Sequence, residues 1–261
     1  MTFRDEVPRF VPVPDRPGSP RRAGTPIRRH WLGPRYRTGA GADVLILQHQ
    51  DNAPAGLLLD VLRSRHLTWR KIRVDRAERL PDPRSVAVTF VLGSDQSVHE
   101  QAPHWLTAEI DWLRSADQAG TGILGIGFGA HALATALGGG SERADRTKRG
   151  WLHVSTADPQ RIAAGPWFSW DDNMVRIPPG AELLAENENG PQAYGTAHHL
   201  GVQFHPEVTP GIIADWVQQD AKHALDTQQI LEATSHEFAT AAHAAHLLFT
   251  TFTSAAQRVH P

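Results

Sequence analysis

Cysteine is absent from all 261 residues of this chain. Its absence excludes disulfide bonds, thiolate-ligated metal sites and any reaction that begins with attack by a cysteine thiolate. The chain also lacks an apolar run near 18 residues and a signal-peptide pattern, so we expect no membrane-spanning helix and a cytoplasmic location. A net charge of −2 argues against general binding of nucleic acid.

The composition of the whole chain, 40% hydrophobic and 21% charged, is typical of a globular protein with one large domain or two small ones. Its charge is uneven, because residues 1–40 hold nine Arg and seven Pro against Asp5, Glu6 and Asp15. We expect this basic arm to be irregular. The functional alternative is that the arm wraps a partner subunit or the acidic remainder of the chain.

Strand and helix patterns alternate after residue 41. Residues 43–48, 71–75 and 86–92 have the apolar character of buried strands. Residues 54–63 are predicted to form a helix with Pro54 in its first turn, and residues 103–118 a second helix with an apolar face. This alternation predicts a parallel α/β sheet with right-handed crossovers, whose ligands bind at the carboxyl ends of the strands.

The most informative stretch is residues 121–140, TGILGIGFGAHALATALGGG. An apolar strand passes into a helix of small residues across only three positions, Gly127, Phe128 and Gly129. In many hydrolases such an elbow carries the nucleophile at its apex, and amides at the helix start stabilise an oxyanion.

The elbow resembles that of class I glutamine amidotransferases, which reads roughly GICxGxQ before an apolar helix ending in LGG. In this chain Gly127 stands at the position of the family's cysteine, and His131 at that of its glutamine. Glycine adopts the unusual backbone of an elbow at no steric cost. The resemblance therefore implies a flavodoxin-like α/β fold, a mostly parallel central sheet flanked by helices, from which the thiolate has been removed.

A second loop supports the resemblance, in particular to the subgroup similar to the amidotransferase domain of GMP synthase. That subgroup has LGGPMSV, with amides that contribute to the oxyanion hole, where this chain has LGSDQSV over residues 92–98. Gly93 is retained, whereas Ser94 and Asp95 replace Gly and Pro. A carboxylate there disfavours a developing oxyanion. Ser94 lacks an elbow of its own, so we expect a turn-capping role rather than a substitute nucleophile.

The second half carries two more family segments. Residues 167–185 resemble FxWHxD followed by LPPGAxLLA, with Asp171 and Asn173 at the positions of the histidine and aspartate. Residues 200–208, LGVQFHPEV, resemble the segment that supplies the histidine and glutamate of a Cys-His-Glu triad. Those two are retained as His205 and Glu207, and their spacing of two puts both on one side of a strand end.

Three hypotheses for the function remain open. In the first, the protein cannot hydrolyse glutamine through a thioester and keeps its pocket for a small molecule or a partner. In the second, it is a repurposed hydrolase, lyase or transferase in which His205 and Glu207 act as a general base on another amide, an amino-acid-like compound or another small molecule. The catalytic positions are then His205, Glu207 and the vacant Gly127, and the substrate-binding positions are Gly93, Ser94, Asp95, Phe128, His131 and Asp171.

The third hypothesis is a metal site formed by His131, His205 and Glu207 with Asp95 or Asp171. No contiguous metal motif is present, so we expect neither a metal nor another cofactor. His49, directly after the first strand, is expected to be either structural or close to the substrate.

The resemblance implies an amidotransferase-like domain over residues 41–224, followed by a helical extension over residues 225–261. Within the extension, residues 230–252 are expected to form a helix with His236, His243 and His246 as polar positions. Four apolar side chains are expected to pack on the domain: Leu231, Phe238, Leu247 and Leu248. His198 and His199 are expected at a hairpin tip. A synthase-type subunit or a second copy is the expected kind of partner, with no role for nucleic acid or membrane.

Overall fold

The computed structural model describes residues 42–98, 103–220 and 227–257, all within one compact unit, Trp31–Pro261. The basic arm predicted for residues 1–40 lies outside the described residues. Within the described ranges, no helix has both the length and the apolar character needed to span a bilayer.

In the described residues, nine strands form one mixed sheet in the order β2-β1-β3-β4-β9-β8-β7-β5-β6. The first five in that order run parallel to one another: β2 Trp69–Arg73, β1 Val44–Gln48, β3 Val88–Val91, β4 Gly122–Ile126 and β9 His199–Val202. The others pair antiparallel: β8 Gly190–Gly195, β7 Glu182–Asn187, β5 Gly140–Thr156 and β6 Gly165–Arg176. The predicted parallel half is thus confirmed, and the second half adds antiparallel strands.

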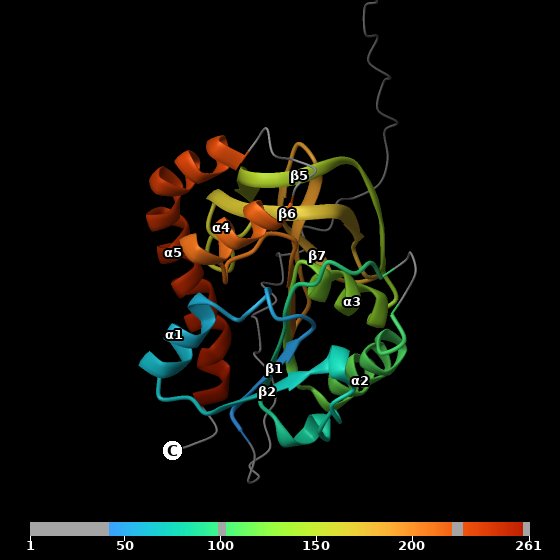
Figure 1. Ribbon diagram of the computed structural model, residues 1–261. Coiled ribbons are helices and arrows are strands. Elements are labelled where there is room, and N and C mark those ends of the chain that lie inside the picture. Colours follow the sequence, from blue (N-terminus) through green and yellow to red (C-terminus); the bar gives the residue numbers. More distant parts are fainter. Residues whose placement is uncertain (1–41, 99–102, 221–226, 258–261) are drawn as a thin grey trace, which may run out of the picture. The chain divides into compact units, whose positions relative to one another are not determined.

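Helices cover both faces of the parallel half. Figure 1 shows α1 Leu57–Ser64 and α5 Thr227–Gln257 on one side, with α2 Leu106–Ala119 and α3 Phe128–Ala136 on the other. The helix α4 Pro210–Gln219 follows β9, and two short 3-10 turns lie at Val74–Arg76 and Pro83–Ser85.

Two apolar cores result from the alternation of side chains along each strand. Val44 and Ile46 of β1 belong to the core that includes α1 and α5, whereas Leu45 and Leu47 belong to the core that includes α2 and α3. The parallel strands β1, β3, β4 and β9 are therefore buried on both faces, whereas the edge strand β2 is exposed over its first three residues.

Several predicted boundaries were wrong. Helix α1 begins at Leu57 rather than at Pro54, because the chain makes a sharp turn at Gly56, where φ is 44°. Helix α2 begins at Leu106, three residues after its predicted start. The predicted hairpin is present, since β8 and β9 pair antiparallel and His198 lies in its turn, but His199 is the first residue of β9 and is buried.

The terminal helix was predicted too short, since α5 has 31 residues. Leu248 is buried as expected, but Leu247 is 51% exposed and does not pack on the domain. His236, His243 and His246 are exposed on α5, as expected for polar positions.

Candidate functional site

The elbow predicted between strand and helix is present. Strand β4 ends at Ile126, α3 begins at Phe128, and the single residue between them, Gly127, has φ 54° and ψ −118°. Its N–H donates to the Val202 carbonyl at 2.8 Å, which joins the elbow to β9. A side chain at Gly127 is strained whatever space surrounds it, because L-residues rarely adopt this backbone.

The imidazole of His205 lies directly against Gly127. A Cβ atom built on Gly127 would lie 2.8 Å from Cε1 and 3.0 Å from Nε2 of His205, and one built on Gly93 would lie 3.1 Å from Cε1. The ring thus occupies the space between the elbow and the loop after β3. Trp216 of α4 packs against it edge-to-face, with ring centroids 4.9 Å apart. This packing leaves no room for a side chain at Gly127 unless His205 moves.

His205 and Glu207 form the expected pair. The His205 Nδ1 and a Glu207 carboxylate oxygen are 2.8 Å apart, and both side chains are buried. Burial alone lowers the pKa of His205, but the charge and hydrogen bond of Glu207, the charge of Asp171 and the Trp170 backbone together raise the pKa above its ordinary value of 6.5. Glu207 therefore orients the ring and favours its protonated form.

A second imidazole–carboxylate pair lies at the same site. His131 on α3 and Asp171 on β6 are 2.8 Å apart between Nε2 and Oδ2, and His131 is buried. Burial alone raises the pKa of Asp171, but the charge and hydrogen bond of His131, the Asn173 amide and the charge of His205 bring that pKa below its ordinary value. The metal-site hypothesis put both residues at one site, but no motif predicted their direct contact, because 40 positions separate them.

His49 proves to be a buried framework residue. Its Nε2 lies 2.9 Å from Glu109 of α2, and its Nδ1 lies 3.3 Å from the Gly93 carbonyl. The rings of Trp105 and Phe128 pack on it, with centroid distances of 5.0 and 4.9 Å. Of the two expectations for His49, the contacts favour the structural one, since this residue joins α2 to the loop after β3. Phe128 is mainly part of the same aromatic packing.

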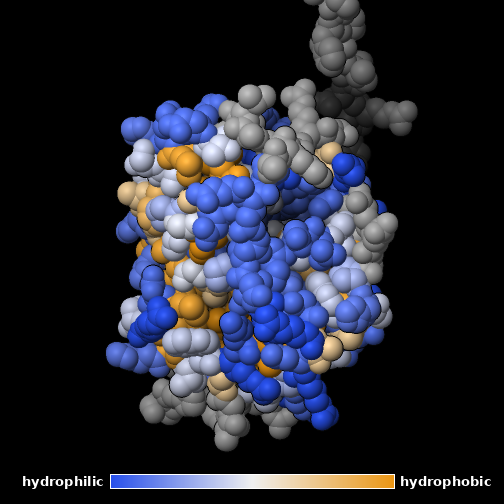
Figure 2. Space-filling model, in the orientation of Figure 1, coloured by the Kyte–Doolittle hydropathy of each residue, from blue (hydrophilic) through white to orange (hydrophobic). Residues whose placement is uncertain are grey.

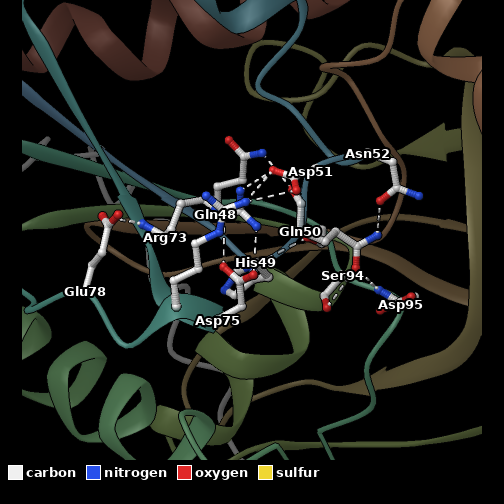
Figure 3. Close-up of polar contacts among 12 residues, drawn as sticks. Gln48, His49, Gln50, Asp51, Asn52, Arg73, Asp75, Glu78, Ser94 and Asp95 are labelled. Carbon is white, nitrogen blue, oxygen red and sulfur yellow. Dashed lines mark hydrogen bonds and ion pairs between the residues drawn. The ribbon is translucent and has the colours of Figure 1, made fainter.

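The loop after β1 holds the loop after β3 in place (Figure 3). The Gln50 side-chain oxygen accepts hydrogen bonds from the Asp95 N–H at 2.8 Å and from the Ser94 hydroxyl at 3.3 Å. Ser94 in turn accepts from the Gln96 N–H at 3.2 Å, the geometry of a turn-capping serine. The buried Arg73, at the end of β2, contacts Asp51 of the loop after β1 and is itself held by the neighbouring Asp75.

These loops form one wall of a cleft of about 540 Å³. Figure 2 shows hydrophilic side chains across the middle of the face that it presents. Five of the lining residues were predicted from the sequence as substrate-binding or catalytic: Gly93, Ser94, Asp95, Asp171 and His205. The lining residues that were predicted in neither role are Gln50, Asn52, Ala53, Gln96, Arg149, Trp170, Asp172, Asn173, Trp216, Gln219 and Asp220.

Arg149 is the most prominent of the missed residues. It lies on β5 and contacts the carboxylates of Asp172 and Asp220. Its guanidinium carbon lies over the Trp170 ring, 4.7 Å from the ring centroid. Trp170 and Asp172 flank Asp171, which the family resemblance singled out, so the sequence could have placed them near the cleft. No sequence pattern could have placed Arg149 and Asp220 there, because only the pairing of β5 with β6 and the end of α4 bring them to the cleft.

A second, small cavity of about 20 Å³ lies at the inner end of the site. Its lining includes Phe128, His131, Asp171 and His205. A volume of this size holds one water molecule or a group as small. Among the described residues, no group of three or more His, Asp or Glu side chains has a geometry suited to a metal ion.

Comparison with known proteins agrees with this architecture. Residues 89–221 match the model of the family described as glutamine amidotransferase class-I. The chain is 40% identical over 101 residues to the GMP synthase of Gloeobacter violaceus, covering 35% of this chain and 18% of the synthase. It is 29% identical over 187 residues to the GMP synthase of Thermomicrobium roseum, covering 66% of this chain and 33% of the synthase. The chain thus spans a third or less of the length of these relatives.

Solved structures show the same fold. A glutamine amidotransferase from Methylobacillus flagellatus superposes with a TM-score of 0.77 at 21% identity, covering 83% of this chain and 96% of that one. A glutamine amidotransferase from Thermotoga maritima gives a TM-score of 0.74 at 20% identity, with coverage of 80% and 97%. The family match covers half of the chain and includes both the elbow and the His205 segment, so this protein belongs to the class I glutamine amidotransferase family.

Proposed function

We propose that this protein is a class I amidotransferase-like domain that forms no thioester with glutamine and uses its cleft to bind a small molecule. The observation that carries the proposal is the contact between His205 and Gly127. Gly127 stands where the family resemblance puts the nucleophilic cysteine, and the imidazole fills the space that a side chain there requires. No thiol elsewhere substitutes, since the chain has no cysteine.

The loop after β3 also departs from what an oxyanion hole needs. Its Asp95 N–H is already bonded to the Gln50 carboxamide, and the Asp95 side chain brings a negative charge to the cleft. An anion that develops beside a carboxylate is destabilised by simple electrostatics. Both halves of the family's chemistry, nucleophile and oxyanion stabilisation, are therefore altered, whereas the cleft itself is retained.

A repurposed enzyme is the second candidate, and the buried His205–Glu207 pair favours it. A carboxylate that holds one imidazole nitrogen leaves the other for proton transfer, and His205 lines both cavities. In this role His205 acts on a bound amide, amino-acid-like compound or other small molecule without covalent attachment to the protein. A partner subunit or a second copy that docks at the cleft is a further form of the binding proposal.

A thermal-shift screen of the native protein and of His205→Ala separates the two candidates. The compounds are amides, amino acids and amines, each tested at increasing concentration. A ligand at about 100 times its dissociation constant raises the unfolding free energy by about 2.7 kcal/mol, which gives a clear shift in Tm.

We expect at least one compound to stabilise the native protein and to remain unchanged during incubation. Consumption of a stabilising compound by the native protein, but not by His205→Ala, would establish the enzymatic candidate in place of simple binding. Absence of any stabilising compound would contradict both candidates and leave docking of a protein partner.

A further inference from the structure

Both ring nitrogens of His49 face groups that accept hydrogen bonds. Its Nδ1 lies 3.3 Å from the Gly93 carbonyl oxygen, and its Nε2 lies 2.9 and 3.2 Å from the two carboxylate oxygens of Glu109. A carbonyl oxygen accepts hydrogen bonds and never donates, and the same is true of an ionised carboxylate. Each ring nitrogen therefore has to donate, and an imidazole with two N–H groups carries a positive charge.

A neutral His49 ring fits these contacts poorly. With its single proton on Nε2, the lone pair of Nδ1 would face the lone pairs of the Gly93 carbonyl, and both buried groups would lack a donor. With the single proton on Nδ1, Glu109 would have to be protonated and donate from one oxygen. Both Glu109 oxygens lie within hydrogen-bond distance of Nε2, which is the arrangement of one N–H shared by a carboxylate.

The surroundings of the His49 ring suit a cation. Trp105 stacks on the imidazole with ring centroids 5.0 Å apart and 24° between the ring planes, and Phe128 meets it edge-on at 4.9 Å. A cation at this distance over an indole face is attracted by the ring quadrupole. The charged side chain in contact with the ring is Glu109, and both side chains of the pair are fully buried. Its negative charge offsets that of the imidazolium.

The contact with His49 also fixes the peptide unit between Gly93 and Ser94. In a trans peptide the C=O and the following N–H point in opposite directions. Because the Gly93 carbonyl points at the buried ring, the Ser94 N–H points away from it. Ser94 lines both the cleft and the small cavity, and its N–H makes no hydrogen bond to another of the described residues.

We propose that Glu109 holds His49 as a buried imidazolium, and that His49 is a positioning residue, which turns the Ser94 N–H toward the ligand of the cleft. The ligand then meets a fixed hydrogen-bond donor at the loop after β3, so it carries an acceptor atom at that end. This positioning role rests on the proposed binding function. The charge of His49 does not depend on it.

Nitrogen NMR of the native protein, labelled with ¹⁵N in its histidine rings, tests the charge. At pH 8 a solvent-exposed histidine holds one ring proton, since its ordinary pKa is about 6.5. We expect His49 to hold two. The internal control is His199, which is also buried, but whose Nδ1 accepts the Ile123 N–H at 3.2 Å while Nε2 faces Asp117 at 2.9 Å. His199 should hold one proton in the same spectrum.

The variant Glu109→Gln tests the positioning role. A carboxamide keeps the shape of the side chain without its charge, and its NH₂ group can donate to His49 Nε2. We expect His49 to become neutral at pH 8, with its proton on Nδ1. A neutral ring donates a weaker hydrogen bond to the Gly93 carbonyl, so the backbone amide resonance of Ser94 should move. Asp111→Asn, on the exposed face of the same helix, is the matched control and should alter neither signal.

Each part of the proposal has its own contrary result. A single proton on native His49 at pH 8, or two protons retained in Glu109→Gln, would overturn the imidazolium held by Glu109. A changed proton count with an unmoved Ser94 resonance would overturn the positioning role, and so would a lower Tm in Glu109→Gln with both signals native. If Glu109→Gln does not fold, the native spectrum still decides the charge.

Ligand binding is measured separately from these signals. A compound from the thermal-shift screen that stabilises the native protein should move the Ser94 amide resonance, because it accepts a hydrogen bond from this N–H. A stabilising compound that leaves the Ser94 resonance unmoved would overturn the positioning role while the binding function stands. If no compound stabilises the protein, the binding function fails, and the charge of His49 is still decided by the native spectrum.

Discussion

Gly127 and His205 depend on each other at the level of single residues. The nearest atom of the imidazole, Cε1, lies 2.8 Å from where a Cβ on Gly127 would lie, and the ring is held by Glu207 and packed against Trp216. A substitution at Gly127 therefore has two separate costs, backbone strain at φ 54° and collision with the ring. Double-mutant analysis distinguishes them.

For Gly127→Ala we expect a loss of about 1–3 kcal/mol in unfolding free energy from strain, with a further loss from the collision. The control is Gly180→Ala, where φ is 78° and no atom lies within 4 Å of the added Cβ. Chemical denaturation of both variants, of His205→Ala and of the double variant measures the coupling. In the double variant, Gly127→Ala should cost less than in the native background. If the losses of unfolding free energy in the two single variants simply add in the double variant, the His205 ring and the elbow do not compete for space.

A second prediction concerns the protonation of His205. Since Glu207 raises the pKa of this imidazole, Glu207→Gln should lower it, and NMR titration of the His205 ring protons measures the change. The raised pKa contributes stability that is fully present below pH 6.5 and is lost as the pH rises through the folded-state value. That part of the pH dependence should disappear in Glu207→Gln. An unchanged His205 titration would contradict the assigned role of Glu207.

Sequence motifs predicted one of the two imidazole–carboxylate pairs of the site but not the other. His205 and Glu207 were predicted as a pair because a spacing of two on a strand end puts them on one side. His131 and Asp171 were each singled out, but their contact depends on how α3 packs against β6. Arg149 carried no motif, and it reaches the cleft only through the pairing of β5 with β6.

At the scale of elements, the site depends on loops that follow strands and are tied to one another. Gln50 connects the loop after β1 to Asp95, and His49 connects it to Glu109 of α2. Both members of the His49–Glu109 pair have fully buried side chains. Removing one partner of such a pair leaves the other buried without its hydrogen bond.

We expect Glu109→Ala to lower the unfolding free energy by at least about 1–3 kcal/mol, because His49 loses its buried acceptor. Asp111→Ala serves as the control, since this residue lies on the exposed face of the same helix and pairs with Arg114 at the surface. Denaturant titration compares the two. Equal, small effects would contradict the view that the His49–Glu109 pair holds α2 to the strand loops.

Element type was predicted better than element boundaries. The strands β1 and β3 are continuous apolar runs, and the alternation of their side chains between two cores follows from the period of two. The start of α1 was misplaced because Pro54 is also compatible with a helix start, whereas the chain turns at Gly56 and the Leu57 N–H donates to the Glu207 carbonyl. That hydrogen bond joins residues 150 positions apart, so no local sequence pattern predicts it.

For the whole molecule, acid stability follows from carboxylates whose pKa lies below the ordinary value. Hydrogen bonds from Arg73 lower the pKa of Asp75, and His131 and His205 outweigh burial to lower that of Asp171. Such groups stabilise the fold above an ordinary pKa of 3.8, and this stability is lost as the pH falls through their folded-state values. We therefore expect Tm to fall steeply below about pH 4.

Thermal unfolding between pH 7 and pH 3 checks this, with Asp75→Asn as the variant. Asparagine cannot titrate, so the variant should have a lower Tm at pH 7 and a shallower decline in acid. The exposed Asp60 provides a matched control through Asp60→Asn, which should follow the native curve. If the Tm of Asp75→Asn falls with decreasing pH as steeply as that of the native protein, the Arg73 ion pairs do not contribute to acid stability.

The glutamine reaction provides the most direct measurement of the central claim that the chain forms no thioester. Purified native protein is mixed with excess glutamine, and glutamate is quantified from the first turnover onward beside a GMP synthase that hydrolyses glutamine. We expect no glutamate above the background without protein, because Gly127 supplies no thiol and His205 fills its place. A burst of glutamate that approaches one equivalent of protein would contradict this claim.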